Sequence, residues 1–325
     1  MIRLLSCFST FYSQSYDTIR NQQSVVNVTR ANLFVYECSF FNFGTSAVYF
    51  LNSIMNLVIS DCLFNTCITK GDGGGIYFSC TGGSIVLNRI CGYNCYSTST
   101  EVSSGQLSYC RTGDNMINEL HYVSCSKCPN SAGVGRYRPI MIFYGLQKVK
   151  NVNFSQNNCI RIPTFQTYYS SSFDQVSLTA INNAASDEQV LNLHGNRAAF
   201  IRLSNIINNV TPNRGVVSIW GSTILTIDSC VFNENSGILF YNGGGSIVVK
   251  NSFITLNGDL SFSSVSLSNT TKYMGSYSID HYSTNMCYAN NPIQHKLCIS
   301  THNLNIRSLK SYFHIVFLLG LLVQF

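Results

Sequence analysis

Two carboxylates come closer than any other residues of this chain to a catalytic arrangement. Glu37 and Asp61 occupy equivalent places in two similar segments. If these segments are adjacent strands of a parallel sheet, the side chains stack about 4.8 Å apart. A polysaccharide hydrolase or lyase needs such a pair, or acids with calcium and a basic residue, on one outer face. We favour the alternative, a solvated corner where both side chains splay, because exposed like charges repel weakly in water.

Other groups for catalysis are scarce. The chain has 14 acidic residues, and its 6 histidines are dispersed rather than placed in a Ser/His/Asp-like pattern. The glycine run 71–75 leads into Ile-Tyr-Phe instead of the Gly-Lys-Ser/Thr of a phosphate-binding loop. We therefore predict a non-enzymatic protein with no catalytic, cofactor-binding or metal-binding residues. A carbohydrate-active β-helix enzyme is the alternative.

Four of the 14 cysteines are spaced in a way that suggests metal binding. Cys125 and Cys128 form a Cys-x-x-Cys pair, and Cys91 and Cys95 could add two more thiolates around a tetrahedral zinc ion. Their spacing is irregular and their context is turn-like, so we favour disulfides or buried free thiols. The sequence leaves the disulfide connectivity open.

The composition favours a β protein that does not bind nucleic acid. Only 10% of the residues are charged while 45% are hydrophobic, and few Glu and Lys residues are present to cover amphipathic helices. The net charge of +6 comes from a scarcity of acidic residues rather than from a basic cluster, since the 20 Lys and Arg residues are scattered singly.

A repeated segment determines the predicted fold. The stretches 33–42, 57–65 and 225–233 share the pattern apolar-x-apolar-x-x-Cys-x-Phe, and a short apolar strand precedes each of them. A corner near Ser60 and Asp61 would turn the apolar residues on both sides inward. Coils of about two dozen residues must then stack to bury their core and pair their edges. The predicted stacked core positions are Cys38, Cys62, Cys230, Phe40, Phe64 and Phe232.

The predicted architecture is an all-β, right-handed parallel β-helix (β-solenoid) with a short apolar C-terminal helix or tail. Residues 1–30 form a weakly defined N-terminal segment or first coil, and residues 31–265 form the β-helix. Residues 266–311 are expected to be an irregular polar juxtamembrane segment, followed by the hydrophobic tail 312–325.

Two short motifs carry a family resemblance. Gly74-Gly75-Ile76 and Gly244-Gly245-Ser246-Ile247 look like a Gly-Gly-Ala-Ile tetrapeptide, whereas Phe154-Ser-Gln-Asn157 and Phe232-Asn-Glu-Asn235 match Phe-x-x-Asn; Phe64-Asn-Thr-Cys67 departs from it. In these motifs the sequence resembles the polymorphic outer-membrane-protein family and its β-helical surface-protein relatives in parasitic protists, over residues 30–260. The resemblance implies a β-helical surface protein with adhesive or antigenic roles.

The ends of the chain and its sequons favour the cell surface. Residues 312–325 are almost wholly apolar, which predicts either a short membrane helix or the cleaved signal of a lipid anchor. The N-terminus is either a signal peptide or a truncated start. Four asparagines head N-glycosylation sequons: Asn27, Asn153, Asn209 and Asn269.

We therefore expect a membrane-attached adhesion or antigen-display module. Its expected partners are the membrane, through the C-terminal tail, and host glycans or surface proteins, with no small-molecule cofactor. Exposed tyrosines such as Tyr96, Tyr168 and Tyr169 are candidate contacts. A purely structural remnant of a larger surface protein is a further alternative.

Overall fold

The chain divides into two compact units, of which Gln14–Gln294 is the larger. A computed structural model describes residues 8–12, 15–20, 22–23, 26, 32–51, 55–98, 105–131, 137–195, 198–255, 259–262, 265–271, 275–284, 286–287 and 292–293. The other unit is described only at α1 (Phe8–Phe11), a single helical turn, and at Tyr12. The predicted hydrophobic tail 312–325 lies outside the described residues.

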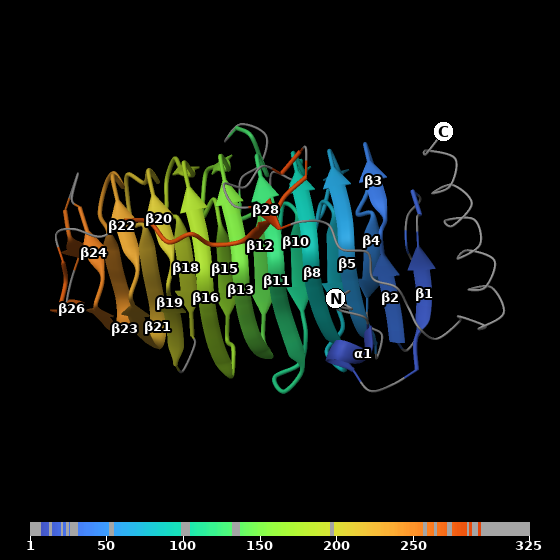
Figure 1. Cartoon of the computed structure of the whole chain (residues 1–325), viewed down its shortest axis with the longest axis horizontal. Helices are drawn as coiled ribbons and strands as arrows, with labels where there is room; N and C mark the ends of the chain where they lie inside the picture. Colours follow the sequence, from blue (N-terminus) through green and yellow to red (C-terminus); the bar gives the residue numbers. More distant parts are fainter. Residues whose placement is uncertain are drawn as a thin grey trace, which may run out of the picture. The chain divides into compact units, whose positions relative to one another are not determined.

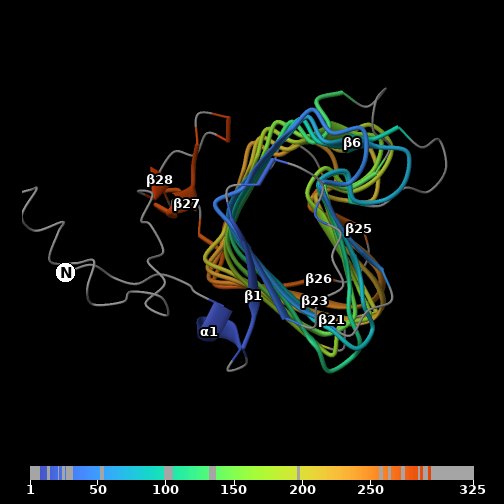
Figure 2. The same ribbon diagram turned by 90° about the vertical axis from the view of Figure 1, so that its right-hand side faces the viewer.

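The larger unit is a parallel β-helix, and this confirms the predicted fold class. Successive coils lie side by side in sequence order in Figure 1, and behind one another around a single interior in Figure 2. All of the strand pairs among the described residues are parallel, and 22 strands belong to one continuous sheet. This sheet has three faces.

The first face runs along the whole unit. It contains β1 (Asp17–Arg20), β2 (Asn32–Tyr36), β5 (Asn56–Asn65), β8 (Ser84–Tyr93), β11 (Ile117–Ser126), β13 (Leu146–Ser155), β16 (Ser172–Ile181), β19 (Ala199–Arg202), β21 (Val217–Asp228), β23 (Phe240–Lys250) and β26 (Val265–Ser268). The coils therefore begin at β1, within the segment 1–30 that the sequence left weakly defined.

The second and third faces complete each coil. The second contains the latter halves of β5, β8, β11, β13 and β16 together with β3 (Ser39–Phe41), β20 (Asn205–Ile207), β22 (Val231–Asn233) and β24 (Phe253–Ile254). The third contains the first halves of β21 and β23 together with β4 (Val48–Leu51), β7 (Ile76–Ser79), β10 (Ser108–Arg111), β12 (Ile140–Phe143), β15 (Phe165–Tyr168), β18 (Leu191–His194) and β25 (Ser261–Phe262).

Three short parallel pairs lie outside this sheet. They are β6 (Ile68–Thr69) with β9 (Tyr96–Ser97), β14 (Asn158–Cys159) with β17 (Ala184–Ala185), and β27 (His281–Tyr282) with β28 (Pro292–Ile293). The first two link neighbouring coils at their turns, whereas the third lies after the last coil in the sequence.

A left-handed corner within the long strands turns both halves of each repeat inward. Asp61 has a φ of 55°, and its equivalents in the neighbouring coils, Glu37 and Arg89, have φ values of 52° and 49°. The residues before and after this corner point into the core, where Leu57 and Cys62 are both fully buried. The corner expected at Ser60 and Asp61 is thus confirmed.

The repeated cysteine and phenylalanine positions form columns in the core. Phe40 is the register partner of Phe64, and their rings stack with centroids 4.9 Å apart. Cys62 pairs with Ile90 of the next coil, so the cysteine position is one that other coils fill with an apolar residue. All six predicted core positions are 0% exposed: Cys38, Cys62, Cys230, Phe40, Phe64 and Phe232.

Buried asparagines form a hydrogen-bonded ladder at the next corner. Asn157, Asn183, Asn209 and Asn235 lie 26 residues apart, and each of the first three donates its backbone N–H to the side-chain oxygen of the next, at 3.0–3.1 Å. The Nδ2 atoms donate to that same oxygen and also to a carbonyl of the preceding coil. The Asn of the Phe-x-x-Asn motif therefore satisfies main-chain groups that the turn leaves without partners.

Cysteines occupy the ladder position in the earlier coils. The backbone N–H of Cys128 donates to Asn157 Oδ1 at 2.7 Å, and that of Cys95 donates to Cys128 Sγ at 3.2 Å. Cys67 continues this column, because its carbonyl accepts from the N–H of Tyr96. The departure of Phe64-Asn-Thr-Cys67 from the family motif is therefore a substitution within one structural column.

The Asn ladder generates a stability prediction. Asn209→Ala removes the acceptor of Asn183 and leaves buried donors unpaired, so it should lower the free energy of unfolding by roughly 3 kcal/mol. Urea unfolding followed by circular dichroism measures this change. The matched control is Asn213→Ala at an exposed turn position, which should change it by less than about 0.5 kcal/mol. Equal effects of the two substitutions would show that the ladder does not stabilise the stack.

Candidate functional site

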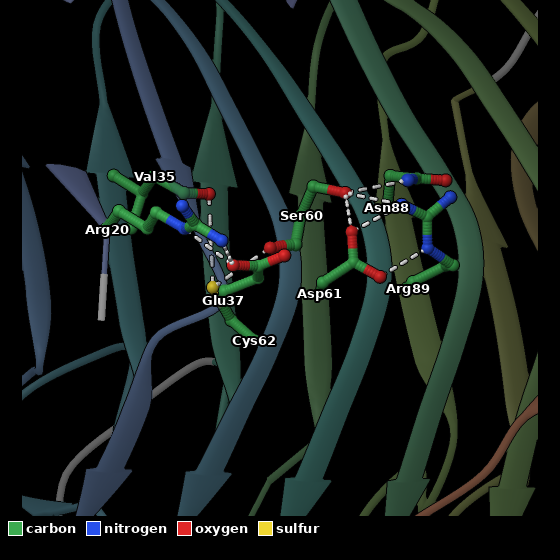
Figure 3. Close-up of polar contacts among 8 residues, drawn as sticks. All are labelled: Arg20, Val35, Glu37, Ser60, Asp61, Cys62, Asn88 and Arg89. Atoms are coloured by element: carbon green, nitrogen blue, oxygen red, sulfur yellow. Dashed lines mark hydrogen bonds and ion pairs between the residues drawn. The ribbon is translucent and has the colours of Figure 1, made fainter. Parts of the chain in front are cut away.

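The two carboxylates of the candidate catalytic pair have separate cationic partners. Arg20 Nη2 lies 2.6 Å from Glu37 Oε2, while Arg89 forms an ion pair with Asp61 (Figure 3). Ser60 Oγ donates to Asp61 at 2.8 Å and accepts from Asn88 Nδ2 at 2.9 Å. The side chains of Asp61 and Arg89 are only 3% and 5% exposed.

This arrangement does not provide an acid–base pair. The side chains do not splay into water, as the favoured interpretation expected, but are paired one to one with arginines from adjacent coils. The hydrogen bond that Arg20 donates to Glu37 is the main cause that raises the pKa of Arg20. Asp61 is too enclosed to reach a substrate. Arg20 and Arg89 act as the counter-ions of the two carboxylates.

Of the four cysteines considered as zinc ligands, one forms a disulfide and the other three are buried free thiols. Cys91 is bonded to Cys287, with Cα atoms 5.8 Å apart. Cys95, Cys125 and Cys128 are buried free thiols. Burial raises the pKa of Cys95 and of Cys128 well above the ordinary value, so both are protonated thiols in this structure. Within the described residues, no group of three His, Cys, Asp or Glu side chains is arranged to hold a metal ion.

The sequons differ sharply in exposure. Asn209 is fully buried within the Asn ladder and Asn153 is 3% exposed, so neither amide can carry a glycan in the folded protein. These two expected glycosylation sites are therefore incompatible with the fold. Asn269 is exposed and stays a predicted site. Asn27 lies outside the described residues.

A continuous stripe of aromatic rings lies on the outer side of the third face. Ring centroids are 4.9 Å apart for Tyr49–Tyr77, 5.2 Å for Tyr77–Tyr109 and 5.5 Å for Tyr109–Phe143. The stripe continues from Phe143 to Tyr168 at 5.0 Å. Alternate residues of these strands point outward, and parallel register places each ring beside its equivalent in the next coil. We define the aromatic stripe by these rings and three that follow: His194, Trp220 and Tyr241.

The stripe is partly exposed along its length. Tyr49 is 36% exposed, and the other rings are half-buried by their neighbours. Burial, together with the charge of Asp72, raises the pKa of Tyr109 to about 12. Its phenol therefore remains a hydrogen-bond donor under physiological conditions.

Charged and hydroxyl groups border the two ends of the stripe. At one end, a hollow of about 560 Å³ is lined by Tyr49, Tyr77, Asp72 and three hydroxyl side chains, Thr45, Ser46 and Thr69. Towards the other end, the guanidinium of Arg214 lies 5.5 Å from the centre of the Trp220 ring. The stripe thus combines flat apolar rings with hydrogen-bonding groups at its edges.

A segment after the last coil returns along the second face. We call residues 275–284 and 286–287 the strap; it includes β27 and appears in orange crossing several coils in Figure 1. Its backbone at Tyr277 exchanges two hydrogen bonds with the Asn205 side chain, and the carbonyl of Tyr282 accepts from Ser124 Oγ. The disulfide of Cys287 with Cys91 fixes its far end. This part of the predicted irregular segment 266–311 is therefore ordered against the β-helix.

A buried histidine anchors the middle of the strap. His281 is 3% exposed, with Nε2 lying 2.8 Å from Thr179 Oγ1 and Nδ1 lying 3.3 Å from the Asn151 carbonyl oxygen. Desolvation lowers the pKa of His281 below its ordinary value of 6.5, and the Asn151 carbonyl and the charge of Asp280 oppose this shift. The attached strap therefore prefers neutral His281.

No protein-family model, curated protein or solved structure matches this chain. The described residues also contain no helix long and apolar enough to cross a membrane. The functional interpretation therefore depends on the geometry of the chain itself.

The sequence identified single tyrosines but not the stripe that contains them. Tyr168 belongs to it, Tyr169 packs beside it at a ring distance of 5.8 Å, and Tyr96 lies in β9, outside it. The signal that could have revealed the stripe is the aromatic residue in each short apolar strand of the third face, such as Tyr77 in Ile-Tyr-Phe. Alternation within those strands predicts that this residue faces outward.

Breaking the buried ion pair between Asp61 and Arg89 should cause a large loss of stability. Asp61→Asn leaves the Arg89 guanidinium buried without a counter-ion and should lower the free energy of unfolding by roughly 3–5 kcal/mol. Asp174→Asn is the matched control, since its pair with Arg202 is 44–45% exposed and should contribute less than about 1 kcal/mol. Chemical denaturation measures both, and similar values would contradict the role of Asp61 as a buried counter-ion.

The protonation of His281 predicts release of the strap in acid. A released strap binds a proton near pH 6.5, whereas the attached strap does so only at lower pH, so attachment is strongest above 6.5 and weakens as the pH falls through the lowered pKa. Hydrogen exchange of residues 276–284, corrected for intrinsic rates, should be faster at pH 5 than at pH 7.5.

His281→Gln should remove this pH dependence. His194→Gln should leave it unchanged, because His194 also has a pKa lowered by burial but lies in the aromatic stripe on the third face. Equal protection of the wild-type strap at both pH values would refute the proposed coupling.

Proposed function

We propose that this protein is a non-enzymatic, surface-displayed β-helix that binds glycans through the aromatic stripe. The observation that carries the proposal is the unbroken series of partly exposed rings at coil spacing, from Tyr49 through Tyr77 and Tyr109 to Phe143 and Tyr168. Side-by-side rings give an extended, flat and partly apolar surface on a rigid support.

The chemistry of the stripe suits an extended polysaccharide. A sugar ring has an apolar C–H face, which gains by stacking on an aromatic side chain, and a rim of hydroxyls that needs hydrogen-bonding partners. The Asp72 carboxylate and nearby hydroxyls supply partners at one end, and the arginine beside Trp220 supplies donors near the other. Rigid Tyr and Trp anchors lose little conformational entropy on binding.

Two features support display outside the cell. The Cys91–Cys287 disulfide joins residues 196 positions apart, and such bonds persist in oxidising compartments. Asn269 also heads an exposed sequon. We propose attachment to the membrane through residues 312–325, and we place the chain with the β-helical surface proteins that its Phe-x-x-Asn motifs resemble.

Binding to immobilised polysaccharides tests the stripe. Affinity electrophoresis of the full chain in gels that contain glucans, mannans or sulfated glycans should show retardation by at least one polymer. Tyr77→Ala should weaken that binding roughly tenfold, as expected when an anchor ring is removed.

Phe200→Ala is the matched control, because Phe200 is 42% exposed on the outer side of the first face, away from the stripe. Thermal unfolding establishes that both variants fold. Equal weakening by the two substitutions, or migration of the wild-type chain unaffected by all of the polymers, would reject the proposal.

A further inference from the structure

The strap and the second face line a half-open cavity between them. Its volume is about 640 Å³, within the range of roughly 300–1,000 Å³ that is usual for small-molecule sites. The floor comes from five successive coils, represented by Tyr93, Ser126, Asn153, Thr179 and Asn205, and the roof comes from the strap. Coils about 4.8 Å apart give such a floor a length of roughly 19 Å.

The lining is polar but almost uncharged. Amide and hydroxyl side chains dominate it, and Lys127 is the one permanently charged residue among the lining residues that the structure describes. Lys127 lies over the Tyr93 ring at 5.8 Å. Tyr277 provides a second ring from the strap. Groups that both donate and accept hydrogen bonds, with aromatic rings beside them, complement a ligand that carries many hydroxyls.

The floor cannot accept a peptide as an added strand. β11, β13 and β16 are each paired with a strand on both sides, so their main-chain groups are already bonded. β-Strand addition requires a free edge. One lysine is likewise too little charge for a polyanion such as nucleic acid.

We propose that this cavity is a second binding site, separate from the aromatic stripe, for a short neutral oligosaccharide. The roof is held at both ends, by the disulfide of Cys287 with Cys91 and by the paired hydrogen bonds at Asn205. The site is therefore formed before the ligand arrives, and this reduces the entropic cost of binding.

Saturation-transfer NMR and calorimetry test this site with the full, oxidised chain. The probes are neutral tetrasaccharides from β-glucan, mannan and chitin. Ile181→Trp, which places a large ring on the cavity floor, should reduce the affinity for the bound tetrasaccharide at least tenfold. Ser278→Trp, which fills the cavity from the strap, should reduce the affinity to the same extent. It provides a second test if Ile181→Trp folds poorly.

Two controls identify where the tetrasaccharide binds. Ile224→Trp adds the same ring at a residue of β21 that is 54% exposed and does not line the cavity, so it should leave the affinity unchanged. Tyr77→Ala should weaken polysaccharide binding to the aromatic stripe but leave the affinity of the cavity for the tetrasaccharide unchanged. Binding that survives both cavity-filling variants, or that is lost only in Tyr77→Ala, would overturn the cavity site. Absence of binding by the wild-type chain to all three tetrasaccharides would overturn it as well.

Discussion

Parallel main-chain hydrogen bonding between coils is the interaction on which the rest of this structure depends. A coil by itself exposes a row of unpaired N–H and C=O groups and half of an apolar core, and only another coil in the same register satisfies both. Register then places equivalent positions over one another. A residue type repeated along the sequence becomes a column in space, whether it is the buried phenylalanines at Phe40 and Phe64, the asparagines at Asn183 and Asn209, or the outer tyrosines.

The same constraint explains how the corners are stabilised. Non-glycine residues in the left-handed region cost roughly 1 kcal/mol each, yet Glu37, Asp61 and Arg89 all adopt it. Their neighbours in the stack compensate: the N–H of Glu37 donates to the Ser60 carbonyl of the next coil, and the charged side chains form pairs with arginines from adjacent coils. A column that resembles a catalytic pair in the sequence is thus a set of neutralised charges at a corner.

The two proposed binding sites lie on different faces, and these faces differ in chemistry. The third face carries aromatic rings in an open row, which suits an extended polymer. The second face is partly covered by the strap and carries a half-open cavity with many hydrogen-bonding side chains, which suits a short ligand. Because the coils fix the spacing on both faces, specificity depends on side chains that the core does not constrain. This separation allows the stack to be stable while its outer surfaces vary.

The sequence alone determined the parallel β-helix, the corner at Ser60 and Asp61, and the burial of Cys38, Cys62 and Cys230, because these depend on local alternation repeated at coil spacing. Tertiary structure alone decided contacts between residues far apart in the sequence. The bond between Cys91 and Cys287, the pairing of Asp61 with Arg89 and the strap over the second face require knowledge of which coils lie side by side. Register partners in neighbouring coils lie between 16 and 33 residues apart, so sequence spacing does not give that register. Only the hydrogen-bonded stack fixes it.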